Sequence, residues 1–209
     1  MSNSNLVTYT KLSPNYSKRT AAISKITIHH AAAINASLAA LGNAFASSSR
    51  QASSNYGIDS NGNVGMFVEE ANRAWTSSNQ ANDNVAVTIE VINCKGSPNW
   101  EISDKALAAL IELCVDICKR NNIKEINFTG NANGNLTLHK YFAATACPGA
   151  YLEGKMPYIA EQINAKLKPT EAAAGTIYRV QVGAFTNKQN AENLLKKLQA
   201  QGYKDAFIK

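Results

Sequence analysis

Residues 84–93 read NVAVTIEVIN, a nearly continuous β-branched run with one acidic side chain, Glu90, inside it. Such a run predicts a central strand that is covered on both faces of a sheet. The segment ISKITIHH (23–30) predicts a second, short strand that ends in two histidines. NYGIDSNGNVGMFVEE (55–70) predicts a hairpin, because two short apolar segments flank the tight-turn pair Asn61-Gly62.

Helical segments flank these strands along the chain. The clearest helix is SDKALAALIELCVDICKRN (103–121), with Ser103 as a plausible N-cap and basic residues in its last turn. Further elements are expected as a helix at 31–51, a strand at 126–131 and a helix at 156–168. The last of these has Pro157 in its first turn, a position that proline tolerates.

The composition is that of a globular protein with a basic balance. Hydrophobic residues make up 45% of the chain and charged residues 17%, and the net charge is +6. No run approaches the ~20 apolar residues that span a bilayer, and the polar leader 1–22 lacks the apolar core of a secretory signal. The basic residues are spread along the chain without a nucleic-acid-binding signature. We therefore expect neither a nucleic-acid nor a membrane partner, and synthesis in the cytoplasm without a signal peptide.

The composition changes after Lys168. PTEAAAGT (169–176) is a small-residue linker, and the remainder reads as strand, turn, helix, turn and strand. A single βαβ unit of this size buries too little apolar surface to stand alone. The expected organisation is a domain at 1–168, a linker at 169–176 and a truncated α+β module at 177–209.

The histidines are candidates for a metal site. A catalytic zinc site needs three protein ligands and one open position, and imidazole and thiolate are preferred donors. His139 and Cys147 lie eight residues apart, a spacing that lets both reach one ion. The third donor is then His29 or His30, and strand alternation allows only one of this pair to reach the ion. The alternative is three ordinary histidines and a core cysteine.

Four motifs together resemble a known family. ITIHHAAA, the hairpin around NGNV, VAVTIEVIN and LHKYFAATACPG occur in the order found in the type 2 N-acetylmuramoyl-L-alanine amidases. That family includes phage endolysins, bacterial autolysins and peptidoglycan recognition proteins. The resemblance implies an α/β fold with a central mixed sheet flanked by helices and a zinc site at one end. It also implies that Zn²⁺ is held by His29, His139 and Cys147.

The resemblance allows two kinds of general base, because family members use either a tyrosine on the hairpin strand or a glutamate on the central strand. Alignment on the hairpin turn puts Ser54 at the tyrosine position and Tyr56 at the position of a packing aromatic. Glu90 matches the branch that uses glutamate. A carboxylate inside an apolar strand is costly to bury unless it is paired or functional, and partial burial raises its pKa. Glu90 is therefore the predicted base, with pairing to a lysine as the alternative.

Three further residues have weaker predicted roles. Thr145 stands where some relatives carry a lysine that stabilises the oxyanion, and its hydroxyl offers one hydrogen bond. Ser54 and Trp75 are expected at the substrate groove. Packing in the core is an equally good interpretation of Trp75.

These features together predict a hydrolase that cleaves the amide bond between N-acetylmuramic acid and L-alanine of peptidoglycan. The tail YRVQVGAFTNKQNAENLLKKLQAQGY resembles the first half of a SPOR domain, a module that binds peptidoglycan glycan strands. We expect an endolysin or autolysin that acts on the wall after release by a holin or by lysis. The alternative is a non-catalytic recognition protein of the same fold, and retention of three ligands and the glutamate favours the enzyme.

Overall fold

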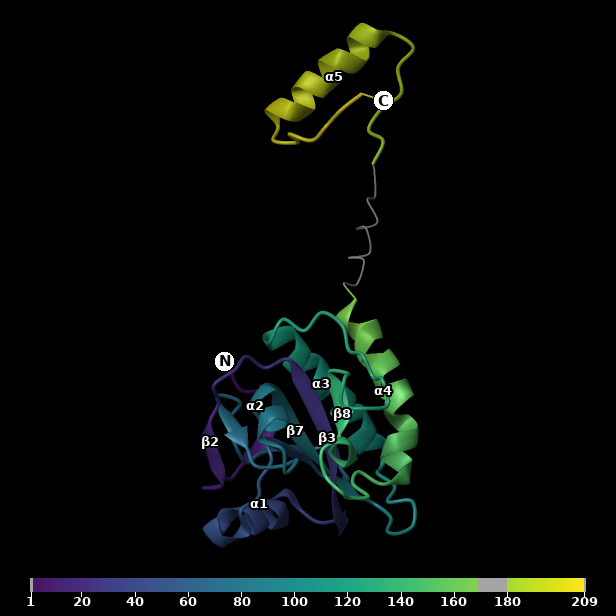
Figure 1. Cartoon of the computed structure of the whole chain (residues 1–209). Helices are drawn as coiled ribbons and strands as arrows, with labels where there is room; N and C mark the ends of the chain where they lie inside the picture. Colours follow the sequence, from purple (N-terminus) through teal and green to yellow (C-terminus); the bar gives the residue numbers. More distant parts are fainter. Residues whose placement is uncertain (1, 169–179, 209) are drawn as a thin grey trace. The chain divides into compact units, whose positions relative to one another are not determined.

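The computed structural model describes residues 2–168 and 180–208. It divides into two compact units, Met1–Pro169 and Thr170–Lys209. Figure 1 shows the sheet and helices of the first unit and helix α5 of the second. Within the described ranges, no helix is both long enough and apolar enough to cross a membrane.

The first unit is built on a mixed six-stranded sheet with the order β1-β5-β4-β7-β3-β8. Its strands are β1 (Val7–Thr10), β3 (Lys25–Ile34), β4 (Tyr56–Ile58), β5 (Val64–Met66), β7 (Ala86–Asn93) and β8 (Leu136–Leu138). The β4–β5 pair is antiparallel and every other pair is parallel. A separate two-stranded ribbon joins β2 (Tyr16–Lys18) to β6 (Asn72–Ala74). The expected mixed α/β sheet is confirmed.

β7 carries apolar side chains on both of its faces, which explains why it lies near the centre of the sheet. Val87, Ile89 and Val91 point into the main core, whereas Ile92 packs into a smaller apolar cluster. Burial on both faces is the arrangement that a continuous β-branched run predicts. Alternation also places Glu90 on the face away from the main core, because successive strand residues point to opposite faces.

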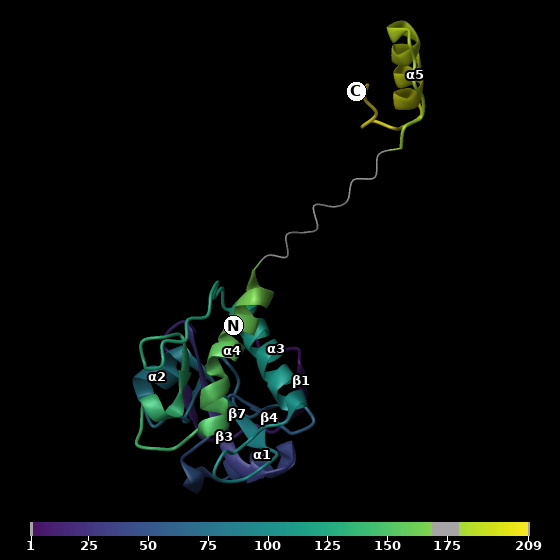
Figure 2. The same ribbon diagram turned by 90° about the vertical axis from the view of Figure 1, so that its right-hand side faces the viewer.

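Helices cover the two faces of the sheet. α3 (Asp104–Arg120) and α4 (Ala150–Leu167) supply apolar residues to the main core, and the two helices lie side by side in Figure 2. The Ser103 hydroxyl accepts a hydrogen bond from the Ala106 amide at 3.1 Å, which confirms the predicted N-cap. α1 (Leu38–Ala46) belongs to the smaller cluster, and α2 (Gln80–Val85) leads directly into β7. The shorter turns are the 3₁₀ helices η1 (Ser48–Arg50) and η2 (His139–Tyr141).

The expected polar leader is instead part of the fold, so that prediction was wrong. β1 pairs with β5, β2 pairs with β6, and the side chain of Arg19 is only 5% exposed. Its guanidinium donates to five backbone carbonyls, a set that provides a partner for the buried charge. Strands of three or four residues are too short to give a clear periodicity in sequence.

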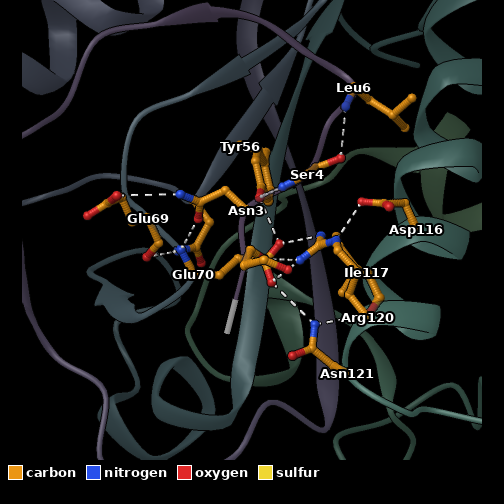
Figure 3. Close-up of polar contacts among 12 residues, drawn as sticks. Asn3, Ser4, Leu6, Tyr56, Glu69, Glu70, Asp116, Ile117, Arg120 and Asn121 are labelled. Carbon is orange, nitrogen blue, oxygen red and sulfur yellow. Dashed lines mark hydrogen bonds and ion pairs between the residues drawn. The ribbon is translucent and has the colours of Figure 1, made fainter.

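A buried acidic residue ties the first residues of the chain to the sheet and to α3 (Figure 3). The Glu70 side chain is fully buried and accepts two hydrogen bonds from Arg120, at 2.6 and 2.8 Å. The Tyr56 hydroxyl donates to Glu70 at 2.7 Å and accepts from the Ser4 amide at 3.0 Å. The Asn3 side chain accepts from the Glu70 amide at 3.0 Å. Residues near the start of the chain thus help to satisfy a buried ion pair.

Two further predicted elements differ from the structure. Residues 126–131 form no strand, because side-chain amides replace a neighbouring strand: Asn164 bonds both the amide and the carbonyl of Ile126. The last helix starts at Ala150 rather than at residue 156, so Pro157 lies inside it. A proline there leaves one helical hydrogen bond unmade, which is why the sequence rule placed it in a first turn.

The segment after the first histidine strand also differs. The predicted helix at 31–51 is shortened to α1, because β3 continues to Ile34 before the chain turns. The Ser37 hydroxyl then caps α1 by accepting from the Ala40 amide. The alanines that follow His30 have high helix propensity, but pairing of β3 with β7 overrides it.

In the second unit, α5 (Lys188–Ala200) matches the predicted amphipathic helix, and Asn187 caps its start. Between residues 180 and 208 the structure contains no strand, so the strands expected on either side of the helix are absent there. Several apolar side chains of this unit are largely exposed, including Val180, Val182 and Phe207. The linker predicted at 169–176 lies outside the described residues.

Candidate metal centre

Three donor side chains converge where β8 ends beside the middle of the parallel strand β3. His29 comes from β3, His139 follows the last residue of β8, and Cys147 lies in the loop before α4. One donor atom from each lies within 4.8 Å of the other two. The segment that contains His139 and the loop that contains Cys147 are held together by a backbone hydrogen bond of 3.1 Å from the Lys140 amide to the Cys147 carbonyl. The fold therefore brings together residues that are distant in the sequence.

The two histidines have the state that metal binding requires. Burial lowers the pKa of His29 well below its usual value, and burial also lowers the pKa of His139, so both rings are neutral near pH 7. The Nε2 atoms of both rings are buried and have no hydrogen-bond partner among the described residues. Unpartnered buried nitrogens are costly unless a ligand satisfies them. The donor set thus fits a divalent ion that prefers nitrogen and sulfur, such as Zn²⁺.

The third donor, Cys147, is 9% exposed and close to the second histidine of the pair. Burial raises the pKa of its thiol to about 12, and the His30 amide donates to its sulfur at 3.4 Å. A metal binds the thiolate, so binding releases the thiol proton. The His30 ring itself packs edge-on against Trp100 at 5.2 Å and is not among the three converging donors.

Glu90 lies beside the donors because of strand register. β3 and β7 pair His29 with Glu90, and the His29 Nδ1 and Glu90 Oε1 atoms are 3.9 Å apart. Burial raises the pKa of Glu90 to about 8, while the charge of Arg50 opposes this shift. The Glu90 Oε2 atom is buried and has no hydrogen-bond partner among the described residues. A carboxyl group with a pKa near neutrality and a free oxygen is suited to proton transfer.

A cleft of about 390 Å³ opens over these residues. Its polar lining includes Glu90, His139, Thr145 and Cys147. The remaining wall is mostly small and apolar and consists of Ala31, Ala32, Ala33, Ala36, Ala40, Leu41, Ala44, Phe45 and Ile92, with His30 and Arg50 completing the lining. The cleft therefore gives a substrate access to Glu90 and to the donors His139 and Cys147.

Of the other predicted site residues, one lines the cleft and two do not. Thr145 lines the cleft, and its hydroxyl oxygen accepts a hydrogen bond from the Cys147 amide at 3.2 Å. Ser54 is fully buried and donates to the Tyr56 carbonyl, so its side chain is not available to a substrate. The Trp75 indole donates to Ser17 and does not line the cleft. Tyr56 is fully buried in the main core, in keeping with a packing aromatic.

Arg50 and the alanine-rich wall were missed by reasoning from sequence. Arg50 lies at the end of η1, in a polar stretch that has no periodicity or motif to single it out. The Ala residues after His30 carried only a helix signal. Their place in the cleft depends on the long-range pairing of β3 with β7, which no local pattern reports.

Comparison with known proteins agrees with this geometry. A family model described as N-acetylmuramoyl-L-alanine amidase (Amidase_2) matches residues 19–150, and a SPOR domain model matches residues 158–209. The first match covers more than half of the chain, and the protein therefore belongs to the N-acetylmuramoyl-L-alanine amidase family. A search of curated proteins by sequence found no match.

Solved structures share the fold at low sequence identity. A mutant endolysin from Bacillus subtilis matches with a TM-score of 0.58 at 18% identity, over 74% of this chain and 97% of that one. PlyL matches with a TM-score of 0.55 at 16% identity, over 74% and 95%. Drosophila peptidoglycan recognition protein SA matches with a TM-score of 0.56 at 18% identity, over 71% and 90%. The fold is thus shared by endolysins and by recognition proteins.

Proposed function

We propose that this protein is a zinc-dependent hydrolase that cleaves the amide bond between N-acetylmuramic acid and L-alanine of peptidoglycan. The observation that carries the proposal is the convergence of three metal donors beside the Glu90 carboxyl group, whose Oε2 atom has no partner among the described residues, at an open cleft. Membership of the amidase family supplies the substrate class. An endolysin or autolysin is the corresponding biological role.

Under this proposal, His29, His139 and Cys147 would hold Zn²⁺. A structural zinc site has four protein ligands, whereas three ligands and an open position are typical of catalysis. Bound Zn²⁺ supplies Lewis acidity, which polarises a carbonyl and makes a water molecule more acidic.

The protein's own residues then manage the proton. Glu90 accepts a proton from the attacking water through its free Oε2 oxygen and passes it to the departing amine of L-alanine. The Thr145 hydroxyl oxygen already accepts from the Cys147 amide, so its proton is free to be donated to the carbonyl oxygen of the substrate. A neutral donor contributes less here than the lysine of some relatives.

The wider proposal concerns domains and location. Residues 1–168 form the catalytic domain, 169–176 a linker and 177–209 a partial SPOR-like module that contributes to wall binding. The match to a SPOR model supports the last assignment. The substrate lies in the cell wall, so the protein acts there after release from the cytoplasm by a holin or by lysis.

Digestion of purified cell walls tests the proposal. Zinc-loaded protein is expected to release stem peptides with a free L-alanine amino group and to leave intact glycan, both identified by mass spectrometry. Glu90→Gln is the matched control, because it keeps the shape of the side chain but removes the base. Wall binding without any cleavage would identify the protein as a recognition protein of the same fold instead.

A further inference from the structure

We propose that Arg50 binds a carboxylate of the stem peptide, namely the α-carboxylate of its second residue, D-glutamate. The protein then prefers stems in which this group is free over stems in which it is amidated. This inference rests on the proposed function, because it assumes that the muramoyl–alanine bond lies over the donors.

Arg50 is an unpaired cation in the cleft. Its side chain is exposed and forms no hydrogen bond or ion pair with any residue that the structure describes. It lines the cleft together with Glu90, His139, Thr145 and Cys147. By contrast, Arg19 and Arg120 are both fully engaged by carbonyls or carboxylates. Arg50 is therefore available to a ligand.

Arg50 differs in charge from the other residues that line the cleft. Among the described lining residues, Arg50 is the only arginine or lysine. Most of the other lining residues are Ala, Leu, Phe and Ile, whose side chains cannot hydrogen-bond an anion in place of Arg50.

Arg50 does not serve as the partner of Glu90. Its charge lowers the pKa of Glu90, yet burial outweighs it and no hydrogen bond joins the two. The Glu90 Oε2 atom has no hydrogen-bond partner among the described residues, so Arg50 does not satisfy it. A guanidinium presents a planar fork of donors that matches a carboxylate in a bidentate way.

The chemistry of the stem peptide identifies the anion. L-alanine contributes the amine of the scissile bond, and D-glutamate follows it with an α-carboxylate that some walls leave free and others amidate. One residue spans roughly 3.5 Å, so this group lies about 7 Å from the scissile amide. The scissile amide is assumed to lie over the donors. A carboxylate about 7 Å from that amide is then within reach of the long Arg50 side chain, which lines the same cleft.

Two small substrates test the proposal with zinc-loaded full-length protein. They are muramoyl-L-alanyl-D-glutamate and muramoyl-L-alanyl-D-isoglutamine, which differ only in the charge of the group in question. The wild type is expected to favour the glutamate form by about tenfold or more in kcat/KM, since losing a charged partner costs at least one hydrogen bond. Arg50→Ala is expected to remove this preference by raising KM for the glutamate form alone, and Arg50→Lys to restore part of it. Lys119→Ala removes an exposed charge on α3, outside the cleft, and is expected to change neither value.

Two outcomes would overturn the inference. An equal loss on both substrates in Arg50→Ala would show that Arg50 acts on the reaction or on folding. A changed pH profile with the preference intact would show that Arg50 only tunes Glu90. Calorimetric binding of the two ligands to the same variants separates this inference from the proposed function: if neither ligand is cleaved but the Arg50-dependent binding preference is present, the inference stands and the proposed hydrolysis fails.

Discussion

His29 and Glu90 occupy paired positions on two neighbouring parallel strands, with the His29 Nδ1 and Glu90 Oε1 atoms 3.9 Å apart. A proposed metal donor and a proposed base are therefore fixed by the same backbone ladder. This relationship makes their separate roles testable by substitution, because each side chain is replaceable without moving the other strand.

Replacement of Glu90 by Gln is expected to abolish hydrolysis while zinc remains bound. Loss of a general base typically lowers turnover by a factor of about 10² to 10⁴. The measurement is the rate of stem-peptide release together with zinc content by mass spectrometry. Loss of zinc from the variant would mean that Glu90 is a ligand.

Replacement of His29 by Ala is expected to weaken metal binding, whereas replacement of His30 by Ala is expected to leave it intact. His29→Ala removes an imidazole donor from the cluster and is expected to lower zinc affinity by at least about 10²-fold. His30→Ala removes a ring that packs on Trp100, while its amide still donates to Cys147, so stoichiometric zinc is expected. Competition with a chelating dye measures both affinities, and the reverse ranking would exchange the two assignments.

The metal-free protein is expected to lose stability as the pH rises from 6.5 to 8. Burial raises the pKa of Glu90 from 4.5 to about 8, so the folded state holds its proton more tightly and loses that advantage as the pH approaches 8. The pKa values of the buried histidines are lowered, so these residues destabilise the folded protein only as the pH falls below their usual pKa of 6.5. Over this window, the free energy of unfolding is expected to fall by about 2 kcal/mol.

Chelator-treated protein unfolded in urea at several pH values measures this change. In Glu90→Gln the free energy of unfolding is expected to stay constant between pH 6.5 and 8, because the amide does not titrate. An unchanged slope in that variant would assign the effect to another group.

The buried ion pair of Figure 3 is expected to contribute strongly to stability. Glu70→Ala leaves the Arg120 guanidinium and the Tyr56 hydroxyl without their common partner, which is expected to cost about 3–5 kcal/mol. Asp116→Ala is the matched control: its pair with Arg120 is partly exposed, with Asp116 28% exposed, and is expected to cost about 1 kcal/mol or less. Urea unfolding of both variants measures the two costs, and equal costs would contradict the role of burial.

The elements that local sequence predicts are those in which one pattern dominates. β7 is a β-branched run, and α3 has an N-cap at Ser103 and basic residues in its last turn, so both were predicted nearly to their ends. The hairpin β4–β5 followed from the Asn61-Gly62 turn. The order of motifs then led to the correct family and to the mixed sheet.

The remainder depended on long-range pairing. β1 and β2 are short and polar in part, and they become strands because β5 and β6 offer free edges. The donors were singled out by residue type and resemblance, whereas their distances and the unpartnered nitrogens required the fold. Arg50 acquires its place in the cleft only through the turn after α1, which carries no sequence signal.

The anchored start of the chain has a practical consequence for protein production. The family match begins at residue 19 and ends at residue 150. A recombinant fragment cut to those limits would lack β1, β2, the Asn3 and Ser4 contacts to Glu70 and Tyr56, and nearly all of α4. It would expose the core positions that Leu152, Met156 and Ile159 cover in the folded unit. Expression of residues 2–168 retains all of these contacts, and it is the shortest fragment we recommend for crystallisation of the candidate metal centre.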